Sequence, residues 1–336
     1  MNVDVENLWC GAWLGRCRLT TSGDRLVSVR RRSAREGQAD LEIPGVVFAG
    51  LRDAHVHLGL VDAGALYAGG LAAVHDLGSP PSVLAPFADA AVLTGLPEVS
   101  YAGQFLTVPG GYPVDRSWSA AGSVCVIAET REAVAAVDTQ VRAGAAFVKI
   151  MLNSDAGPVF DDATLDAVVR AAHAGGRPVV AHVEGRGQAA RAFESGVDRL
   201  AHAPWTERLP DELLAAMAPS MRWVSTLDIH GRGVEFDVAA DNLRRFRARG
   251  GVAVYGTDQG NGPQPVGVNP RELSALLGAG LDRAAVLDAI AVPWPAGTAP
   301  RLAWAPGTPP TDDADWAVWL ASTRNLAPAQ IKEQFG

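Results

Sequence analysis

The sequence predicts an α/β protein, a (β/α)8 TIM barrel with a small β-sandwich domain that is formed from both chain termini. Between residues 46 and 299, eight short apolar segments typical of strands alternate with segments of helical periodicity. The flanking segments, 1–45 and 300–336, carry strand patterns but are too small to be stable alone. We therefore expect the barrel at 46–299 and the small domain from 1–45 plus 300–336.

The two ends of the chain supply the strands of the small domain. Near the N-terminus, the strand candidates are 8–14, 16–20 and 26–29. Near the C-terminus, a Pro- and Gly-rich stretch precedes 314–320 (ADWAVWL), whose alternating pattern predicts a strand. This last strand is expected to pair with the N-terminal ones.

The barrel strands and several barrel helices follow from periodicity and from end signals. Asp161 is a helix-capping residue before a helix at 161–174, and Pro270 follows Asn269 at the start of another. Further helices are expected at 130–142 and 189–195. A doubly wound sheet is the competing α/β arrangement, but it would not explain the residues at the strand ends. The strand candidates are 46–55, 71–77, 98–106, 146–152, 178–183, 198–202, 222–228 and 252–258.

Composition excludes some function classes. The net charge is −8, with 29 basic and 37 acidic residues and no long run of one sign, which argues against a nucleic-acid or membrane partner. The three cysteines show no Cys-x-x-Cys spacing, and no apolar run is long enough to span a membrane. With no secretory signal visible, we expect a cytoplasmic location.

Metal-binding side chains gather at the predicted strand ends. His55 and His57 are two residues apart, so they project from the same face of a strand, and two adjacent imidazoles suit a divalent metal. A His-x-His pair alone is common. The ends of further strands add other residues with metal-binding chemistry, and active sites of barrels lie at these ends. The six candidates are His55, His57, Lys149, His182, His202 and Asp258.

Six motifs in order resemble those of the amidohydrolase superfamily of metal-dependent hydrolases, most of all its imidazolonepropionase-like and prolidase-like subgroup. The likeness covers nearly the whole chain, and departures include Arg52 in the first motif and Glu184 where many members have a second His. The matching segments are 50–58 (GLRDAHVHL), 73–78 (AVHDLG), 148–150 (VKI), 181–185 (AHVEG), 198–202 (DRLAH) and 256–258 (GTD), and 314–319 resembles the terminal strand.

The resemblance implies a metal-dependent catalytic domain with two divalent ions, zinc being the expected metal. His55 and His57 would bind the more buried ion, and His182 and His202 the second. Lys149 would be carboxylated and bridge both ions. Asp258 would bind the first ion and take the proton of the bridging water. Mononuclear members exist, in which Lys149 would be an ordinary lysine, and imidazole and carboxylate ligands also suit Mn, Fe or Ni.

The implied function is hydrolysis of a C–N bond in a small molecule, an amide, lactam, cyclic imide or N-acyl amino acid, by a metal-activated hydroxide. Lactone or ester hydrolysis, non-hydrolytic use as a decarboxylase or isomerase, and a non-enzymatic scaffold are the alternatives. Expected substrate contacts are His230, Tyr112 and Gln259. The segment 203–205 and the loop 103–122 are expected to shape a partly aromatic pocket. Many members form oligomers, so a homo-oligomer stays open.

Overall fold

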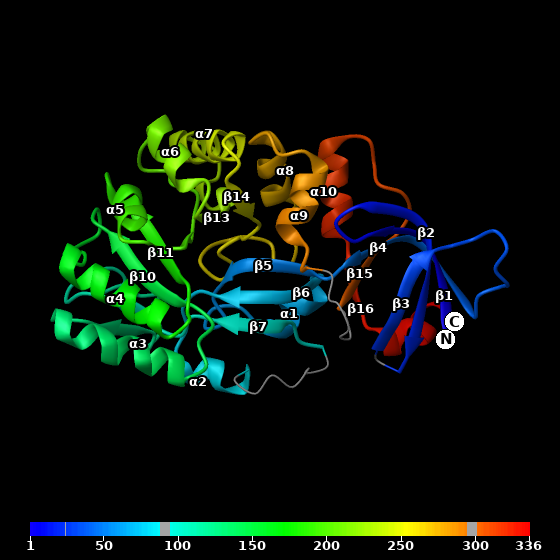
Figure 1. Ribbon diagram of the computed structural model, residues 1–336, viewed down its shortest axis with the longest axis horizontal. Coiled ribbons are helices and arrows are strands. Elements are labelled where there is room, and N and C mark those ends of the chain that lie inside the picture. Colours follow the sequence, from blue (N-terminus) through cyan, green and yellow to red (C-terminus); the bar gives the residue numbers. More distant parts are fainter. Residues whose placement is uncertain (24, 88–94, 294–300) are drawn as a thin grey trace.

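The protein is described by a computed structural model, which covers residues 1–23, 25–87, 95–293 and 301–336. A barrel lies beside a terminal β-sheet, and both chain ends lie on that sheet (Figure 1). The predicted boundary at 299/300 falls outside the described residues. In the described part of the chain, no helix has the length and apolar character needed to cross a bilayer.

In the part of the chain that the structure describes, eight parallel strands form the barrel. β5, β6 and β7 pair in sequence order, and β10 to β14 continue in order in a second sheet that also holds β8 (Phe105–Thr107) and β9 (Val124–Val126). The barrel strands are β5 (Leu51–Val56), β6 (Leu71–Asp76), β7 (Glu98–Tyr101), β10 (Val148–Asn153), β11 (Val179–Glu184), β12 (Arg199–Leu200), β13 (Arg222–Val224) and β14 (Val252–Val254).

Backbone hydrogen bonds close the barrel at both seams between the two sheets. The Ala54 N–H donates to the Tyr255 carbonyl (3.0 Å) and the Asp258 N–H to the His55 carbonyl (2.8 Å), which joins β14 to β5. The Ala146 N–H donates to the Tyr101 carbonyl (2.8 Å), which joins β10 to β7. The predicted (β/α)8 barrel is therefore confirmed. The candidate strand at 46–55 divides at Gly50 between β4 of the terminal sheet and β5.

Helices cover the outside of the barrel (Figure 1). In α4, Asp161 accepts the Thr164 N–H at 2.7 Å as the predicted cap. The same helix buries Leu165, Val168, Val169 and Ala172, which share one face at helical spacing. The helices are α1 (Ala63–Ala68), α2 (Pro81–Leu84), α3 (Ala133–Arg142), α4 (Asp162–Ala174), α5 (Gln188–Glu194), α6 (Asp211–Met217), α7 (Val234–Ala248), α8 (Pro270–Gly278) and α9 (Arg283–Ile290).

The terminal domain is a six-stranded sheet that both chain ends build. Its order is β16-β15-β4-β1-β2-β3, and β15 pairs antiparallel with β4, which joins the C-terminal strands to the N-terminal ones. The predicted contribution of both termini is confirmed. The strands are β1 (Asn2–Trp9), β2 (Trp13–Ser22), β3 (Arg25–Arg31), β4 (Leu41–Ala49), β15 (Leu302–Ala305) and β16 (Arg324–Leu326), and α11 (Ile331–Phe335) ends the chain.

One predicted strand was wrong, because 314–320 lies within the helix α10 (Asp313–Ala321). Asp312 caps this helix by accepting the N–H groups of Ala314 and Asp315. Trp316 and Leu320 are buried one turn apart, which is helical spacing, while Val318 is 62% exposed. The apolar residues therefore fit a helix, and the C-terminal strands are β15 and β16.

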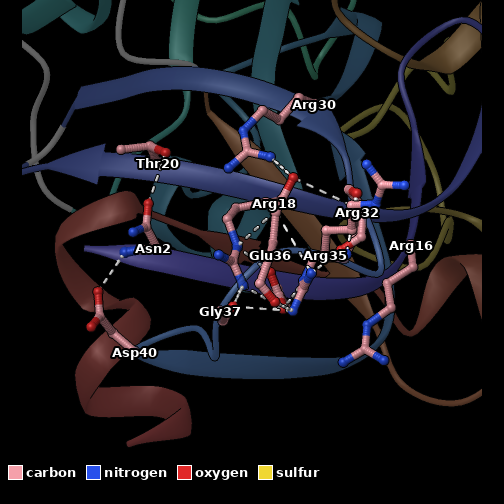
Figure 2. A network of polar contacts seen from close by, with 12 residues as sticks. Asn2, Arg16, Arg18, Thr20, Arg30, Arg32, Arg35, Glu36, Gly37 and Asp40 are labelled. Atoms are coloured by element: carbon pink, nitrogen blue, oxygen red, sulfur yellow. Dashed lines mark hydrogen bonds and ion pairs between the residues drawn. The ribbon is translucent and has the colours of Figure 1, made fainter.

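A buried ion cluster lies on the terminal sheet. Arg18 binds the Asp4 carboxylate through two nitrogens (2.6 and 2.9 Å), and Arg32 Nε binds it at 2.7 Å. Glu36 joins the cluster from the following turn (Figure 2). The Arg18 hydrogen bond, aided by Arg32, lowers the pKa of Asp4 to about 2. Every charge at the centre of this cluster therefore has a partner.

Candidate metal centre and its cavity

The six predicted ligands line one cavity of about 250 Å³ at the carboxyl ends of the barrel strands. β5, β10 and β11 position His55, Lys149 and His182, while His202 and Asp258 lie just after β12 and β14. All six are almost fully buried. The complete lining is His55, His57, Phe105, Tyr112, Trp118, Lys149, Met151, His182, Glu184, His202, Trp205, Ile229, His230, Asp258 and Asn261.

Hydrogen bonds to the rest of the protein orient three of the imidazoles. His55 Nδ1 faces the Ala201 carbonyl and His57 Nδ1 faces the Gly78 carbonyl, each at 2.9 Å. A carbonyl can only accept, so each Nδ1 carries a proton, and in the neutral ring Nε2 keeps its lone pair. His202 Nδ1 contacts the Thr226 hydroxyl at 2.8 Å. These bonds leave the Nε2 atoms of the three rings available as ligand atoms.

Asp258 meets the nitrogens of His55 and His57 from the end of the neighbouring strand, β14. Its Oδ1 lies 3.2 Å from His55 Nε2 and 2.9 Å from His57 Nε2, and Asn261 donates to Oδ2 at 3.1 Å. Burial opposes ionisation, but His55 and His57 hold the pKa of Asp258 well below its usual value. Asp258 has φ +59° and Thr226 φ +43°, the two positive values among the non-glycine residues of the described chain. Backbone strain is thus concentrated at this site.

The donor set fits a metal ion. The ligand atoms of His55, His202 and Asp258 lie within 4.8 Å of one another. Within the described ranges, His55 Nε2 and Asp258 Oδ1 are buried without a hydrogen-bond partner. An unsatisfied buried nitrogen and oxygen aimed at one point cost free energy unless something binds them. A divalent cation is held well by imidazole and carboxylate ligands.

Besides Asp258, the cavity holds a second buried ionisable group, the amine of Lys149. The chain has 29 basic residues, of which only Lys149 and Lys332 are lysines. Lys149 is 1% exposed, and among the described residues no carboxylate lies within ion-pair distance of its amine. Burial lowers its pKa to about 7, partly offset by Asp258 and Asp76. The position therefore holds a side chain that readily becomes a neutral amine, which an arginine would not.

His182 is oriented by a carboxylate instead of a carbonyl. Its Nε2 lies 3.1 Å from Glu184 Oε2, and Asn153 donates to the same oxygen at 2.7 Å. Glu184 lies two residues after His182 on β11, so the two side chains share one face of the strand. This contact directs the Nε2 proton to Glu184 and leaves Nδ1 as the free nitrogen.

Aromatic side chains form much of the remaining wall. Tyr112 stacks on His182 with ring centroids 5.1 Å apart, and Trp205 packs edge-on against His182 and His202. Trp118 lies against His57. The segment 203–205 and the loop 103–122 thus supply cavity residues, as predicted. Burial raises the pKa of Tyr112, so its hydroxyl stays protonated.

His230 lies at the cavity as predicted, and its ring packs against Trp205 with the ring centroids 4.9 Å apart. Burial lowers its pKa to about 4, so the ring is neutral at physiological pH. Its Nε2 is buried and has no hydrogen-bond partner in the described part of the chain. It is therefore placed to bond a molecule in the cavity.

Gln259 requires a correction, because it does not line the cavity. Its side chain points away, donating to Asp53 Oδ2 (3.0 Å) and to the Gly267 carbonyl (2.8 Å) and accepting the Gly267 N–H (2.7 Å). All its hydrogen-bonding capacity is used within the protein. We therefore assign Gln259 a structural contact in place of the predicted substrate contact.

Sequence reasoning had not selected Glu184, Asn261, Trp118 or Thr226 as site residues. Glu184 could have been found, because it shares a strand face with His182. Asn261 and Trp118 lie in loops, and Thr226 follows β13, so only the folded chain brings them to the predicted ligands.

The chain shares its fold with solved hydrolase structures. No protein-family model and no curated protein matches its sequence. Over 98% of each chain it superposes on a Xaa-Pro dipeptidase with methionine bound in the active site, with a TM-score of 0.78 and 19% identity. It also matches the A. niger ochratoxinase (TM-score 0.77, 18% identity) and molinate hydrolase (TM-score 0.76, 14% identity). For both of these, the match covers 98% of this chain and 94% of the other. These likenesses establish the fold.

Proposed function

We propose that this chain is a member of the amidohydrolase superfamily and hydrolyses a C–N bond of a small molecule with two divalent metal ions. One observation carries the proposal. Four imidazoles, a lysine and a carboxylate converge on one cavity, and the rings are held so that a nitrogen of each is free. Three of the solved structures that share the fold are a dipeptidase, an ochratoxinase and a hydrolase, which agrees with this reaction class.

Two groups of ligands would hold the ions. His55, His57 and Asp258 would bind the first ion, and His182 Nδ1 and His202 Nε2 the second. When bound, two divalent cations lower the pKa of a water molecule towards neutrality and polarise the substrate carbonyl. Zinc is the metal we propose, because nitrogen-rich sites of this kind suit it.

Lys149 would bridge the two ions as a carbamate. The neutral amine attacks carbon dioxide, a C–N bond forms, and the nitrogen releases one proton to solvent. The product is an anion with two oxygen donors, whereas an ammonium cannot bind a cation. The absence of an ion-pair partner for Lys149 among the described residues supports this assignment.

Asp258 is the proposed acid–base residue. Its carboxylate would accept the proton of the attacking water and then donate it to the leaving nitrogen. The Asn261 side chain, which donates to Oδ2, would keep the carboxylate oriented for both steps. The neutral His230 would hydrogen-bond the substrate through Nε2.

The aromatic walls favour a substrate with an apolar or aromatic group next to the scissile bond. Tyr112, Trp118 and Trp205 offer ring faces and edges, and among the described residues no arginine lines the cavity to pair with a substrate carboxylate. We therefore propose a neutral amide, lactam or imide in preference to a strongly anionic one.

The decisive experiment is metal content per chain, measured by elemental analysis on wild type and on Lys149→Ala. We expect two ions in wild type and one or none in the variant. Lys332→Ala, which changes the one other lysine on an exposed helix, is the control and should keep two. One ion in all three proteins would contradict the binuclear site. Hydrolysis itself is tested in oxygen-18 water, since only hydrolysis places the label in the product.

A further inference from the structure

The interior of the barrel is arranged in layers. Below the metal-ligand layer lies an apolar layer made of two groups, Ala54, Val224 and Val254, and Leu77, Ala102, Phe147, Val180 and Ala201. Side chains two positions apart on a strand share a face. The next interior positions towards the amino ends of the strands are therefore Arg52 on β5, Arg199 on β12 and Arg222 on β13.

These three arginines lie close to one another at the amino-terminal mouth of the barrel. Arg199 and Arg222 are register partners on adjacent parallel strands. Arg52 lies two strands beyond Arg222, because β14 stands between β13 and β5. The charges act on each other: burial and the neighbouring arginines lower the pKa of both Arg52 and Arg199. Three cations thus share one end of the barrel interior.

No acidic side chain of the described residues forms an ion pair with these three arginines. Within the described ranges, none of the three guanidinium groups lies within ion-pair distance of a carboxylate, and Arg52 Nε is buried without a partner. The two acids that act on the cluster, Asp53 and Asp198, are hydrogen-bonded elsewhere, to Thr257 and to His173 respectively.

The contacts of Arg199 are weak ones. Its NH1 lies 3.3 Å from His75 Nδ1, and its guanidinium lies over the Phe147 ring at 5.2 Å. Burial together with Arg52 and Arg199 holds the pKa of His75 well below its usual value, so the ring is neutral and adds no charge. The cluster differs from Arg18 and Arg32 of the terminal sheet, which share Asp4.

The geometry points to an oxyanion site: we propose that the amino-terminal mouth of the barrel binds a small tetrahedral oxyanion, such as phosphate, between Arg52, Arg199 and Arg222. Guanidinium groups bind phosphate oxygens in pairs, and an anion would remove the repulsion between the three cations. Arg222 is exposed and the other two are half-buried, so an anion can reach them from solvent. The apolar layer separates this site from the metal centre.

The test is thermal unfolding of the metal-loaded protein in increasing inorganic phosphate, with ionic strength held constant by chloride. A ligand that binds only the folded state raises the Tm. We expect a rise of a few degrees in wild type, and less than half of that rise in Arg199→Gln and Arg222→Gln. Arg170→Gln, which removes the same charge from an exposed side chain of α4, is the matched control and should respond like wild type.

Phosphate could also raise the Tm by binding at the metal centre. That part of the rise would be the same in all four proteins, so a difference between the variants reports on the arginine site. Arg222→Gln changes an exposed residue, so it stays folded even if Arg199→Gln does not. An equal rise in all four proteins, or no rise in wild type beyond the chloride control, would overturn the proposal. Replacing phosphate with a phosphomonoester in the same series shows whether the site takes the free anion or a phosphorylated metabolite.

Discussion

The ion cluster of the terminal sheet and the cavity of the barrel are both buried and polar, yet they are built in opposite ways. In the terminal sheet, Asp4 accepts three hydrogen bonds from Arg18 and Arg32, so donors and acceptors balance. Among the described residues of the cavity, His55 Nε2 and Asp258 Oδ1 lack hydrogen-bond partners, and Lys149 has no carboxylate within ion-pair distance. A balanced cluster stabilises the fold, whereas an unbalanced one indicates a ligand.

The largest effect is expected for Asp258→Asn. An amide cannot accept the proton of the attacking water, so kcat on the best substrate of an amide panel should fall about 10³-fold or more. Steady-state kinetics on the metal-loaded variant measures this. Metal analysis must accompany it, because His55, His57 and His202 should still retain metal. Undiminished turnover would exclude Asp258 as the acid–base residue.

The opposite response is expected for Asp4→Asn, which leaves Arg18 and Arg32 buried without their shared partner. The free energy of unfolding should fall by about 3 kcal/mol, as measured by urea denaturation. The kcat/KM should stay at the wild-type value, since Asp4 lies in the terminal sheet. Glu42→Gln is the control: this residue pairs with Arg16 in an exposed ion pair, and its loss should cost no more than about 0.5 kcal/mol. Equal effects of the two variants would show that burial of the cluster does not matter.

A smaller effect is expected at Glu184, whose carboxylate has hydrogen-bond partners within the cavity, His182 and Asn153. Glu184→Ala removes the acceptor of His182 Nε2, so the ring loses its preferred tautomer, and metal affinity should fall about 10-fold. Competition with a chelator measures the affinity. Glu194→Ala, on the exposed end of α5, should leave the affinity unchanged. If both variants bind metal like wild type, Glu184 does not position His182.

The smallest effect is expected in how the Tm falls at acidic pH. The folded-state pKa of Asp4 is about 2, below its ordinary value of 3.8. The ionised Asp4 carboxylate therefore stabilises the folded state fully above pH 3.8, and this stabilisation is lost as the pH falls towards 2. Between pH 4 and pH 2, the Tm of wild type should therefore fall further than the Tm of Asp4→Asn. Calorimetry across this range, in the same buffers, gives the difference. Parallel curves for the two proteins would show that Asp4 is not the titrating group.

Local pattern predicted the strands and the residues that gather at their ends, because strand alternation and strand ends are properties of short segments. His55, His57, Lys149, His182, His202 and Asp258 were found in this way, and all six line the cavity. The pattern failed at Gln259. The neighbouring Asp258 has φ +59°, which breaks the alternation, and Asp53, more than 200 residues away, takes the Gln259 side chain.

The sequence by itself determined the barrel, the order of its strands and the residue types at their ends, since each depends on periodicity within a few residues. Only the tertiary structure decided that 314–320 is a helix, because its apolar residues fit both periods and β15 supplies the strand that pairs with β4. It also decided which buried charged groups have an ion-pair partner. Asp4 meets Arg18 and Arg32, while Arg52, Arg199 and Arg222 have no ion-pair partner among the described residues. The physical reason is that an ion pair depends on distances between strands, which the spacing of residues along one strand does not specify.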